Sequence, residues 1–221
     1  MVSITDEQIA AGQAVYTPRT LRVYDFVVLG VSNRLIWKCP TSRLLKHYNA
    51  HVTDNHLDVG VGSGYFPDRC RFPSSSPRVG LMDLNADALD FAAKRIQRYD
   101  PETYRCDILQ PLSLDGKKFD SVAVNYVLHC LPGSMSTKAV VFDHLAELLN
   151  PGGVLFGSTL LHGGVRRGWA AKRLMAFYNR KGIFSNADDG FDDLDAQLAV
   201  RFESYQTRVI GSVALFSGRL S

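Results

Sequence analysis

The sequence predicts an α/β protein with a seven-stranded, mostly parallel sheet that has helices on both faces and an antiparallel C-terminal hairpin. Two observations lead to this fold class. From residue 54 onward, short apolar runs alternate with amphipathic stretches, which is the pattern of a parallel sheet wound with helices. After residue 202, two extended runs follow one another around Gly211, and this arrangement indicates a hairpin that closes the sheet.

Seven strands are expected, and the first five are expected to be parallel. Each is a short apolar or β-branched run bounded by turn residues. Their expected ranges are His56–Val59, Arg78–Asp83, Thr103–Cys106, Ser121–Asn125, Val154–Thr159, Glu203–Ile210 and Ser212–Arg219.

Helices are expected in the connections between the strands. A short helix follows Ser63, and the Asn-Pro-Gly-Gly segment 150–153 is typical of a helix stop followed directly by a strand. The acidic residues from Asp188 onward fit the start of a last helix, because acidic side chains complement the dipole there. The longer expected helices span Ala86–Tyr99, Thr137–Leu149, Arg166–Lys181 and residues 188–202.

The chain is expected to form one domain of three parts, since 221 residues can bury a continuous core. Residues 1–53 form an expected N-terminal helical cap, in which Thr5 and Gln8 are spaced as a capping box and Thr17-Pro18 is placed as a second helix start. Residues 54–160 form the expected cofactor-binding core. Residues 161–221 add a lid helix, the last helix and the hairpin.

Composition and charge exclude several classes of protein. A chain with 46% hydrophobic and 21% charged residues is typical neither of disorder nor of a membrane protein. The N-terminus shows no secretory signal pattern, so we expect a cytoplasmic protein. Four cysteines without a CxxC pair argue against disulfides and zinc. Both signs of charge are scattered at a net +3, which gives no support for nucleic-acid binding.

A glycine-rich turn after the first expected strand carries the strongest functional signal. It contains Gly60, Gly62 and Gly64, and glycine lets the backbone approach a ligand closely and adopt positive φ. Asp58 precedes the turn, and Asp83 ends the next strand, where an acid binds ribose hydroxyls. A dinucleotide-binding dehydrogenase is the natural competitor, but its glycines are spaced GxGxxG, whereas the spacing here is GxGxG.

The pattern Asp58-x-Gly60-x-Gly62-x-Gly64 resembles motif I of class I S-adenosylmethionine-dependent methyltransferases, in particular the small-molecule branch of type 11 and type 12 enzymes. These enzymes have a Rossmann-like sheet. The resemblance implies that the loop lies along the amino-acid part of S-adenosylmethionine, with S-adenosylhomocysteine as the product. Asp83 matches the ribose-binding acid, and Leu84 matches the residue that packs on adenine.

Three later segments extend this resemblance over residues 56 to 160. Asp107 and Ile108 match the motif whose acid accepts from the adenine amino group while its neighbour flanks the ring. The segment 119–129 resembles the fourth-strand motif and implies that Asn125 and Tyr126 contact the cofactor, and 149–153 resembles the turn before the fifth strand. Because open α/β sheets bind ligands at the carboxyl ends of their strands, these segments are expected to converge on one crevice.

Two histidines are candidates for a catalytic base. His129 lies four positions past Asn125, and His162 follows the fifth expected strand. A histidine near its ordinary pKa can take a proton from a hydroxyl or an amine as the methyl group arrives. A packing or capping role for His129 is an equal alternative. The reaction needs no base if holding donor and acceptor in line supplies the acceleration.

Aromatic side chains outside the shared core are the candidate acceptor-binding residues, because they suit a lidded apolar pocket. Packing between helices is the alternative for the N-terminal ones, and Tyr24-Asp25 resembles a Tyr-Asp pair of quinone- and small-molecule-methylating enzymes. No residue cluster suited to a metal is found. The candidates are Tyr16, Tyr24, Trp37, Trp169 and Phe177.

The sequence therefore predicts methyl transfer from S-adenosylmethionine to an oxygen or nitrogen of a small aromatic or heterocyclic metabolite. No nucleic acid, membrane or metal is expected to take part, and a homodimer is one option for the assembly. The alternative from a different class is a protein that binds S-adenosylmethionine without methylating, as a pseudoenzyme, a partner subunit or a catalyst of another rearrangement, because a fold does not fix a function.

Overall fold

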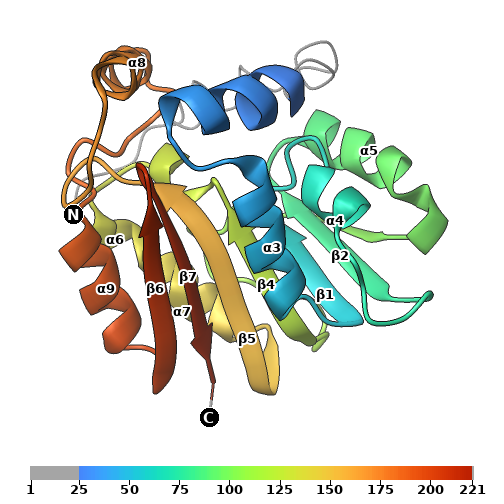
Figure 1. Ribbon diagram of the computed structural model, residues 1–221. Helices are drawn as coiled ribbons and strands as arrows, with labels where there is room; N and C mark the ends of the chain where they lie inside the picture. The colour runs from blue at the N-terminus through green and yellow to red at the C-terminus, as the bar shows by residue number, and fades with distance from the viewer. Residues whose placement is uncertain (1–24, 221) are drawn as a thin grey trace.

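The computed structural model describes residues 25–220, and in them a seven-stranded sheet is flanked by helices (Figure 1). The strand order is β3-β2-β1-β4-β5-β7-β6. Neighbours among β1 to β5 pair in parallel, and β7 is antiparallel to both β5 and β6. The strands are β1 Asn55–Val59, β2 Arg78–Asp83, β3 Glu102–Arg105, β4 Phe119–Asn125, β5 Leu149–Leu160, β6 Ser204–Ile210 and β7 Val213–Arg219. The predicted fold class is confirmed.

Helices cover both faces of the sheet, which explains why its central strands are almost continuously buried. Tyr48 packs edge-on against Phe156 of β5 on one face, and Phe142 packs against Phe216 of β7 on the other. The first face carries α3 Thr41–His51, α4 Tyr65–Arg69 and α5 Ala86–Arg95. The second carries α6 Met135–Lys138, α7 Val140–Ala146 and α9 Phe191–Ala199.

Two further helices lie above the carboxyl ends of the strands, at the top of Figure 1. They are the π-helix η1, Asp25–Ile36, and α8, Trp169–Arg180. We use the name cap for η1, α8 and residues 181–190. Cap residues share one apolar cluster with strand residues: Leu29, Trp37, Cys39, Leu44, Tyr126, Leu160, Ala171, Met175, Phe184, Val213 and Leu215. The described part of the N-terminal segment is helical as predicted, whereas Thr5, Gln8 and Thr17-Pro18 lie outside the described residues.

Several predicted boundaries were wrong for identifiable reasons. The helix predicted over Thr137–Leu149 is divided into α6 and α7, and Leu149 pairs with Phe119, so β5 begins before Val154. The helix predicted to reach Tyr99 ends at Arg95 in α5, and a 3₁₀ turn, Gln97–Tyr99, follows it. The start of β5 is determined by its pairing with a distant strand, and the periodicity of a short segment contains no information on such pairing.

Three observations concern membranes, metals and thiols. Within residues 25–220, no helix is long and apolar enough to cross a membrane. The same part of the chain contains no group of three or more acidic, histidine or cysteine side chains arranged to hold a metal ion. The cysteines Cys39, Cys70, Cys106 and Cys130 are all free thiols.

Candidate functional site

The glycine loop leads from β1 into α4 through three left-handed residues. Gly60, Gly62 and Gly64 have φ values of +68°, +49° and +69°. A Cβ atom on Gly60 would lie 2.2 Å from Val127 Cγ2, and one on Gly64 would lie 3.0 Å from Ala92 Cα. A Cβ atom on Gly62 would meet nothing within 4 Å. Packing therefore requires the outer two glycines, while Gly62 faces open space.

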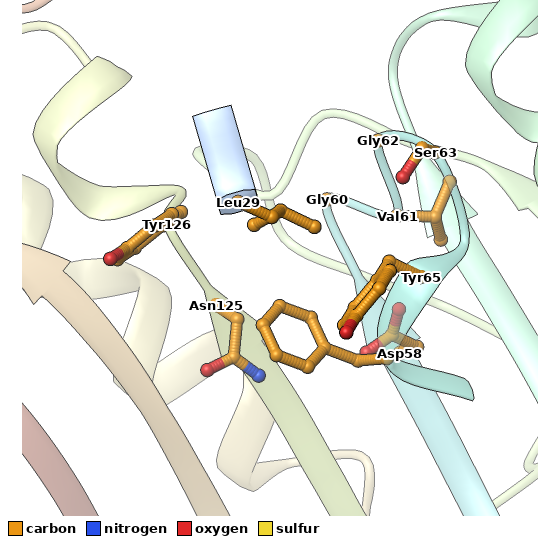
Figure 2. A pocket seen from close by; sticks show the side chains of 10 residues that line it. Leu29, Asp58, Gly60, Val61, Gly62, Ser63, Tyr65, Asn125 and Tyr126 are labelled. Atoms are coloured by element: carbon orange, nitrogen blue, oxygen red, sulfur yellow. The ribbon is translucent and has the colours of Figure 1, made fainter. Parts of the chain in front are cut away.

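A cleft lies beside this loop, between the ends of β1 and β4 and the cap helix η1 (Figure 2). It encloses about 370 Å³, including the part that is open to solvent. Its lining residues are Leu29, Asp58, Gly60, Val61, Gly62, Ser63, Tyr65, Phe66, Asn125 and Tyr126. The structure thus brings five of the predicted cofactor residues together in one cleft: Asp58, Gly60, Gly62, Asn125 and Tyr126.

A chain of buried polar groups leads from the core to Asp58. The Tyr48 hydroxyl donates to Asp58 Oδ1 at 3.1 Å and lies 2.7 Å from His56 Nε2, and His56 Nδ1 lies 2.8 Å from Ser121 Oγ. Since the hydroxyl has one proton, it accepts from His56 Nε2–H. Burial raises the pKa of Asp58 to about 8, against the opposing effect of the Tyr48 hydrogen bond, and burial lowers the pKa of His56 to about 3. Tyr48 and His56 therefore fix the position of the Asp58 carboxyl group.

Asn125, at the end of β4, is 9% exposed and presents one unsatisfied donor. Ser158 Oγ donates to its Oδ1 at 2.8 Å, while its Nδ2 has no hydrogen-bond partner among residues 25–220. The next residue, Tyr126, has a φ of 58° and donates from its hydroxyl to Asn33 Oδ1 at 2.9 Å. An unsatisfied buried donor costs about 1–3 kcal/mol, so its presence in a cleft favours a bound ligand there.

Asp83 ends β2 beside the glycine loop. Its Oδ1 accepts from the Asn85 backbone N–H at 2.9 Å. Burial raises the pKa of Asp83, and the backbone N–H groups of Asn85, Gly62, Leu84 and Val61 oppose that rise. The carboxyl group is thereby held next to the backbone of the loop.

The remaining predicted cofactor residues lie along the same edge of the sheet but do not line the cleft. Leu84 is half-buried, and Asp107 Oδ1 accepts from the Leu109 backbone N–H at 3.0 Å. Ile108 is buried and its carbonyl oxygen lies 2.9 Å from His144 Nδ1. Because the strand order is β3-β2-β1-β4, Asp107, Asp83, the glycine loop and Asn125 follow one another along the edge. We call this set the strand-end row.

Asp25 links the cap to the glycine loop, a role that the sequence alone does not predict. Ser63 Oγ donates to Asp25 Oδ1, and Arg95 Nη1 donates to Asp25 Oδ2 at 2.6 Å and to the Ser63 carbonyl oxygen at 3.1 Å. Asp25 and Ser63 are 38 positions apart, and no spacing pattern predicts such a pair. Tyr48 was missed for the same reason, since only the fold brings it to Asp58.

His129 has the contacts of a packed, neutral histidine. It is 3% exposed, its ring lies edge-on against Phe184 with the centroids 4.6 Å apart, and its Nδ1 accepts from the Leu160 backbone N–H at 3.3 Å. Burial, followed by the charge of Lys138, lowers its pKa to about 3. His129 does not line the cleft, and the packing alternative accounts for these contacts.

His162 lies just after β5 and is half-buried. Its backbone N–H donates to the Asp189 carbonyl oxygen at 2.9 Å. Burial and the charge of Arg167 lower its pKa, which keeps the imidazole neutral at neutral pH.

None of the predicted acceptor-binding aromatics that the structure describes lines the cleft. Tyr16 and Tyr24 lie outside the described residues. Trp37 is 2% exposed and packs in the cap cluster, with its ring centroid 6.3 Å from that of Phe184. Packing is therefore the interpretation that the contacts of Trp37 favour.

The two aromatics of α8 lie on its solvent-exposed side. Trp169 is 73% exposed and Phe177 is 42% exposed. The guanidinium carbon of Arg173 lies 5.1 Å from the centroid of the Trp169 ring. A contact of either residue with an acceptor remains a prediction.

A buried ion pair holds the cap to the second face of the sheet. Lys138 Nζ donates to Asp189 Oδ2 at 2.9 Å and to the Ser185 carbonyl oxygen at 2.7 Å, and neither charged side chain is exposed. The interpretation of the acidic cluster as a helix start is correct for Asp192 and Asp193, which lie in the first turn of α9. It was wrong for Asp189, whose carboxylate pairs with a lysine 51 positions away.

The sheet order, the glycine loop and the acid at the end of β2 define a class of protein, the class I S-adenosylmethionine-dependent methyltransferases. The chain belongs to this family. A family model described as a methyltransferase domain matches residues 57–155. S-adenosylmethionine is therefore the methyl donor, and the chain is a methyltransferase.

Particular relatives and solved structures agree with this assignment. The chain is 38% identical to demethylluteothin O-methyltransferase of Streptomyces thioluteus, over 96% of this chain and 93% of that protein. It is 41% identical to N-methyltransferase vrtF of Penicillium aethiopicum, over 81% of this chain and 76% of that protein. The fold matches the DhpI–SAH complex with a TM-score of 0.71 at 14% identity, over 99% of each chain.

Proposed function

We propose that the chain methylates an oxygen or nitrogen of a small aromatic or heterocyclic metabolite, with the donor bound along the strand-end row. The main observation behind this proposal is the strand-end row. The neighbouring strands β3, β2, β1 and β4 are followed or ended by Asp107, Asp83, the glycine loop and Asn125, all of which are suited to bind a ligand. Relatives named as O- and N-methyltransferases support both kinds of acceptor atom.

The residues present fit S-adenosylmethionine. Open space at Gly62 leaves room for a ligand against the backbone, and the orphan amide of Asn125 supplies a donor in the same cleft. In this proposal Asp83 accepts from the ribose hydroxyls, and Asp107 accepts from the adenine amino group between Leu84 and Ile108. Residues Asp58, Gly60, Gly62, Gly64, Asn125 and Tyr126 surround the amino-acid part. When bound, the donor supplies an electrophilic methyl group on a sulfonium sulfur.

In this proposal, the residues of the chain accelerate methyl transfer mainly by positioning the donor and the acceptor. A group whose pKa is about 3, as for the buried His129, is a weak base at neutral pH. We therefore assign His129 to packing and keep His162 as the candidate proton acceptor, because it is half-buried after β5 and stays neutral. Holding donor and acceptor in line then supplies most of the acceleration.

The proposal extends to the location and the assembly of the protein. The four free cysteines support a reducing compartment such as the cytoplasm. A homodimer remains a prediction of the sequence.

Calorimetric titration with S-adenosylhomocysteine tests the proposed function. We expect micromolar binding by the wild type and at least tenfold weaker binding by Asp83→Ala, which corresponds to about 1.4 kcal/mol. Asp90→Ala, which removes an exposed acid of α5, is the matched control and should keep the wild-type affinity. Absence of binding by the wild type would contradict the proposal.

Turnover separates the proposed function from the non-methylating alternative. A screen of phenols, hydroxylated heterocycles and amines with methyl-labelled S-adenosylmethionine should transfer label to at least one acceptor. Bound donor that transfers no label to any member of these classes would favour the alternative.

A further inference from the structure

The cap carries most of the large apolar side chains that the fold leaves in solvent. Among residues 25–220, six such side chains are exposed, and four of them belong to the cap. Trp169 and Phe177 lie on α8, and Val31 and Leu35 lie on η1. Apolar side chains that are exposed singly need no explanation, whereas a group of them on one part of the surface indicates a binding partner.

The exposed side of α8 alternates aromatic and cationic side chains. Trp169, Arg173 and Phe177 follow one another at intervals of four positions, so they lie along one side of the helix. The Arg173 guanidinium stacks on the Trp169 ring, with 5.1 Å between the guanidinium carbon and the ring centroid. Ala171 and Met175 are buried on the opposite side, in the apolar cluster shared with η1. One side of α8 therefore packs on the protein, and the other presents rings and charges to the solvent.

The exposed charges around these apolar side chains are of one sign. Neither residues 166–187, which include α8, nor residues 26–53, which include most of η1, contain an aspartate or a glutamate. The exposed cations of the two segments include Arg34, Arg166, Lys172, Arg173, Arg180 and Lys181. The outer side of the cap is thus suited to a partner that is both anionic and able to take up apolar side chains.

A lipid bilayer with anionic headgroups fits all of these side chains. Aromatic rings enter the boundary between headgroups and acyl chains, and lysine and arginine pair with lipid phosphates. A nucleic acid would use the rings and the cations but gives no role to the aliphatic Val31 and Leu35. A second copy of the chain would bring cations against cations. We propose that the cap docks on an anionic membrane surface, with Trp169 and Phe177 inserted and the surrounding cations on the headgroups.

Docking by the cap turns the cleft toward the membrane. Figure 1 shows η1 and α8 above the carboxyl ends of the strands, and Leu29 of η1 lines the cleft. The composition of the chain predicts no membrane partner. The exposed side of α8 revises that expectation, because composition does not tell which side chains the fold leaves in solvent. Membrane docking goes beyond the proposed function and does not depend on it.

Vesicle binding followed by intrinsic fluorescence tests the proposal on the full chain. The chain has two tryptophans, and Trp37 is buried in the cap cluster, so a blue shift on addition of vesicles reports Trp169. We expect this blue shift, and cosedimentation, with vesicles of phosphatidylglycerol and phosphatidylcholine in equal parts. Binding to vesicles of phosphatidylcholine alone should be at least tenfold weaker, because each cation near an anionic surface contributes about fivefold.

Matched variants separate the inserted rings from the charges. Trp169→Ala/Phe177→Ala should weaken binding at least about tenfold, whereas Val200→Ala, which truncates an exposed apolar side chain outside the cap, should change it less than about twofold. Trp169→Phe keeps a ring and should keep most of the binding while the blue shift is lost. Arg173→Gln should weaken binding about fivefold, and Arg208→Gln, at an exposed position of β6, should leave it unchanged.

Any of four results would overturn the proposal. No cosedimentation with the anionic vesicles at physiological ionic strength would exclude the membrane as partner. Binding without a blue shift, and without loss in the double aromatic variant, would show adsorption by charge alone. Tighter binding to single-stranded RNA than to the vesicles would assign this side of the cap to a nucleic acid. A dimer that the double variant dissociates in analytical ultracentrifugation would assign it to a second copy of the chain.

Circular dichroism shows whether the double aromatic variant is folded. Its spectrum should match that of the wild type, since both side chains lie largely in solvent. If the spectrum differs, Trp169→Ala alone takes its place in the vesicle and ultracentrifugation measurements, with the same expected direction.

Discussion

The strand-end row and the cap differ in how their residues are used. In the row, polar groups and glycines lie at positions that local backbone geometry determines, as with the left-handed turn of Gly60, Gly62 and Gly64. In the cap, aromatic side chains are divided between an apolar cluster and the solvent, as Trp37 and Trp169 show. A ligand site that is formed by the backbone can therefore be recognised from a short sequence motif. Whether a helix side chain is buried or exposed depends instead on residues far away in the sequence.

Loss of the ion pair between Lys138 and Asp189, which attaches the cap, is expected to lower the stability most. Lys138→Met leaves Asp189 as an uncompensated buried charge and should lower the free energy of unfolding by about 3–5 kcal/mol, measured by urea denaturation. Lys138→Met/Asp189→Leu removes both charges and should recover most of that loss. A single variant that loses less than about 1 kcal/mol would show that the cap is held without this pair.

A second pair of variants tests the backbone geometry of the row. Gly60→Ala combines a left-handed non-glycine residue, at about 1–2 kcal/mol, with a contact to Val127 Cγ2 at 2.2 Å. Gly62→Ala carries only the conformational cost, because its Cβ meets nothing within 4 Å. Urea denaturation should therefore rank Gly60→Ala as less stable than Gly62→Ala, and adding Val127→Ala should narrow the gap. Equal losses would contradict the packing account.

The fold and the row could be predicted because their signals are local. Apolar runs gave the strands, and the spacing of Asp58, the glycines and Asp83 gave the loop and the acid beside it. The boundary of β5 at Leu149 could not be predicted, because it depends on pairing with Phe119. The Asp25–Ser63 link joins positions that only the folded chain brings together.

His129 is a further residue whose environment could not be predicted from the sequence. His129 occupies a position where the resemblance implies proximity to the donor, yet its environment is made by Phe184 and Leu160 from later in the chain. The sequence left packing and catalysis open, and only the later segments decide the environment of the ring.

Titration of His129 is expected to have a smaller effect, which appears in the pH dependence of the stability. The pKa of His129 is lowered from its ordinary 6.5 to about 3, so the unfolded chain binds the proton more tightly. The resulting stability is fully present above pH 6.5 and is lost as the pH falls toward 3, by roughly 1 kcal/mol per unit. The raised pKa of Asp58 has the opposite sign, because its contribution is lost as pH rises from 3.8 toward about 8.

Comparison with a variant isolates the His129 contribution. Between pH 6 and pH 4, the free energy of unfolding of His129→Gln should fall less steeply than that of the wild type, by roughly 1 kcal/mol per pH unit. Urea denaturation at each pH measures this difference. Parallel curves for the two proteins would show that His129 is not held neutral by burial.

The smallest expected effect concerns the exposed aromatics of α8. Trp169→Ala and Phe177→Ala should each change the free energy of unfolding by no more than about 0.5 kcal/mol, because both side chains are largely in solvent. The acceptor KM of these variants, once an acceptor is known, tells whether either residue contacts it. A large loss of stability would show that the outer side of α8 packs against another part of the protein.

A crystal structure of the complex with S-adenosylhomocysteine would locate the methyl donor on this sheet. We expect the ribose hydroxyls within hydrogen-bond distance of Asp83 and the amino-acid end between the glycine loop and Asn125. A ligand bound away from the carboxyl ends of β1, β2 and β4, or a ribose that does not contact Asp83, would contradict this expectation.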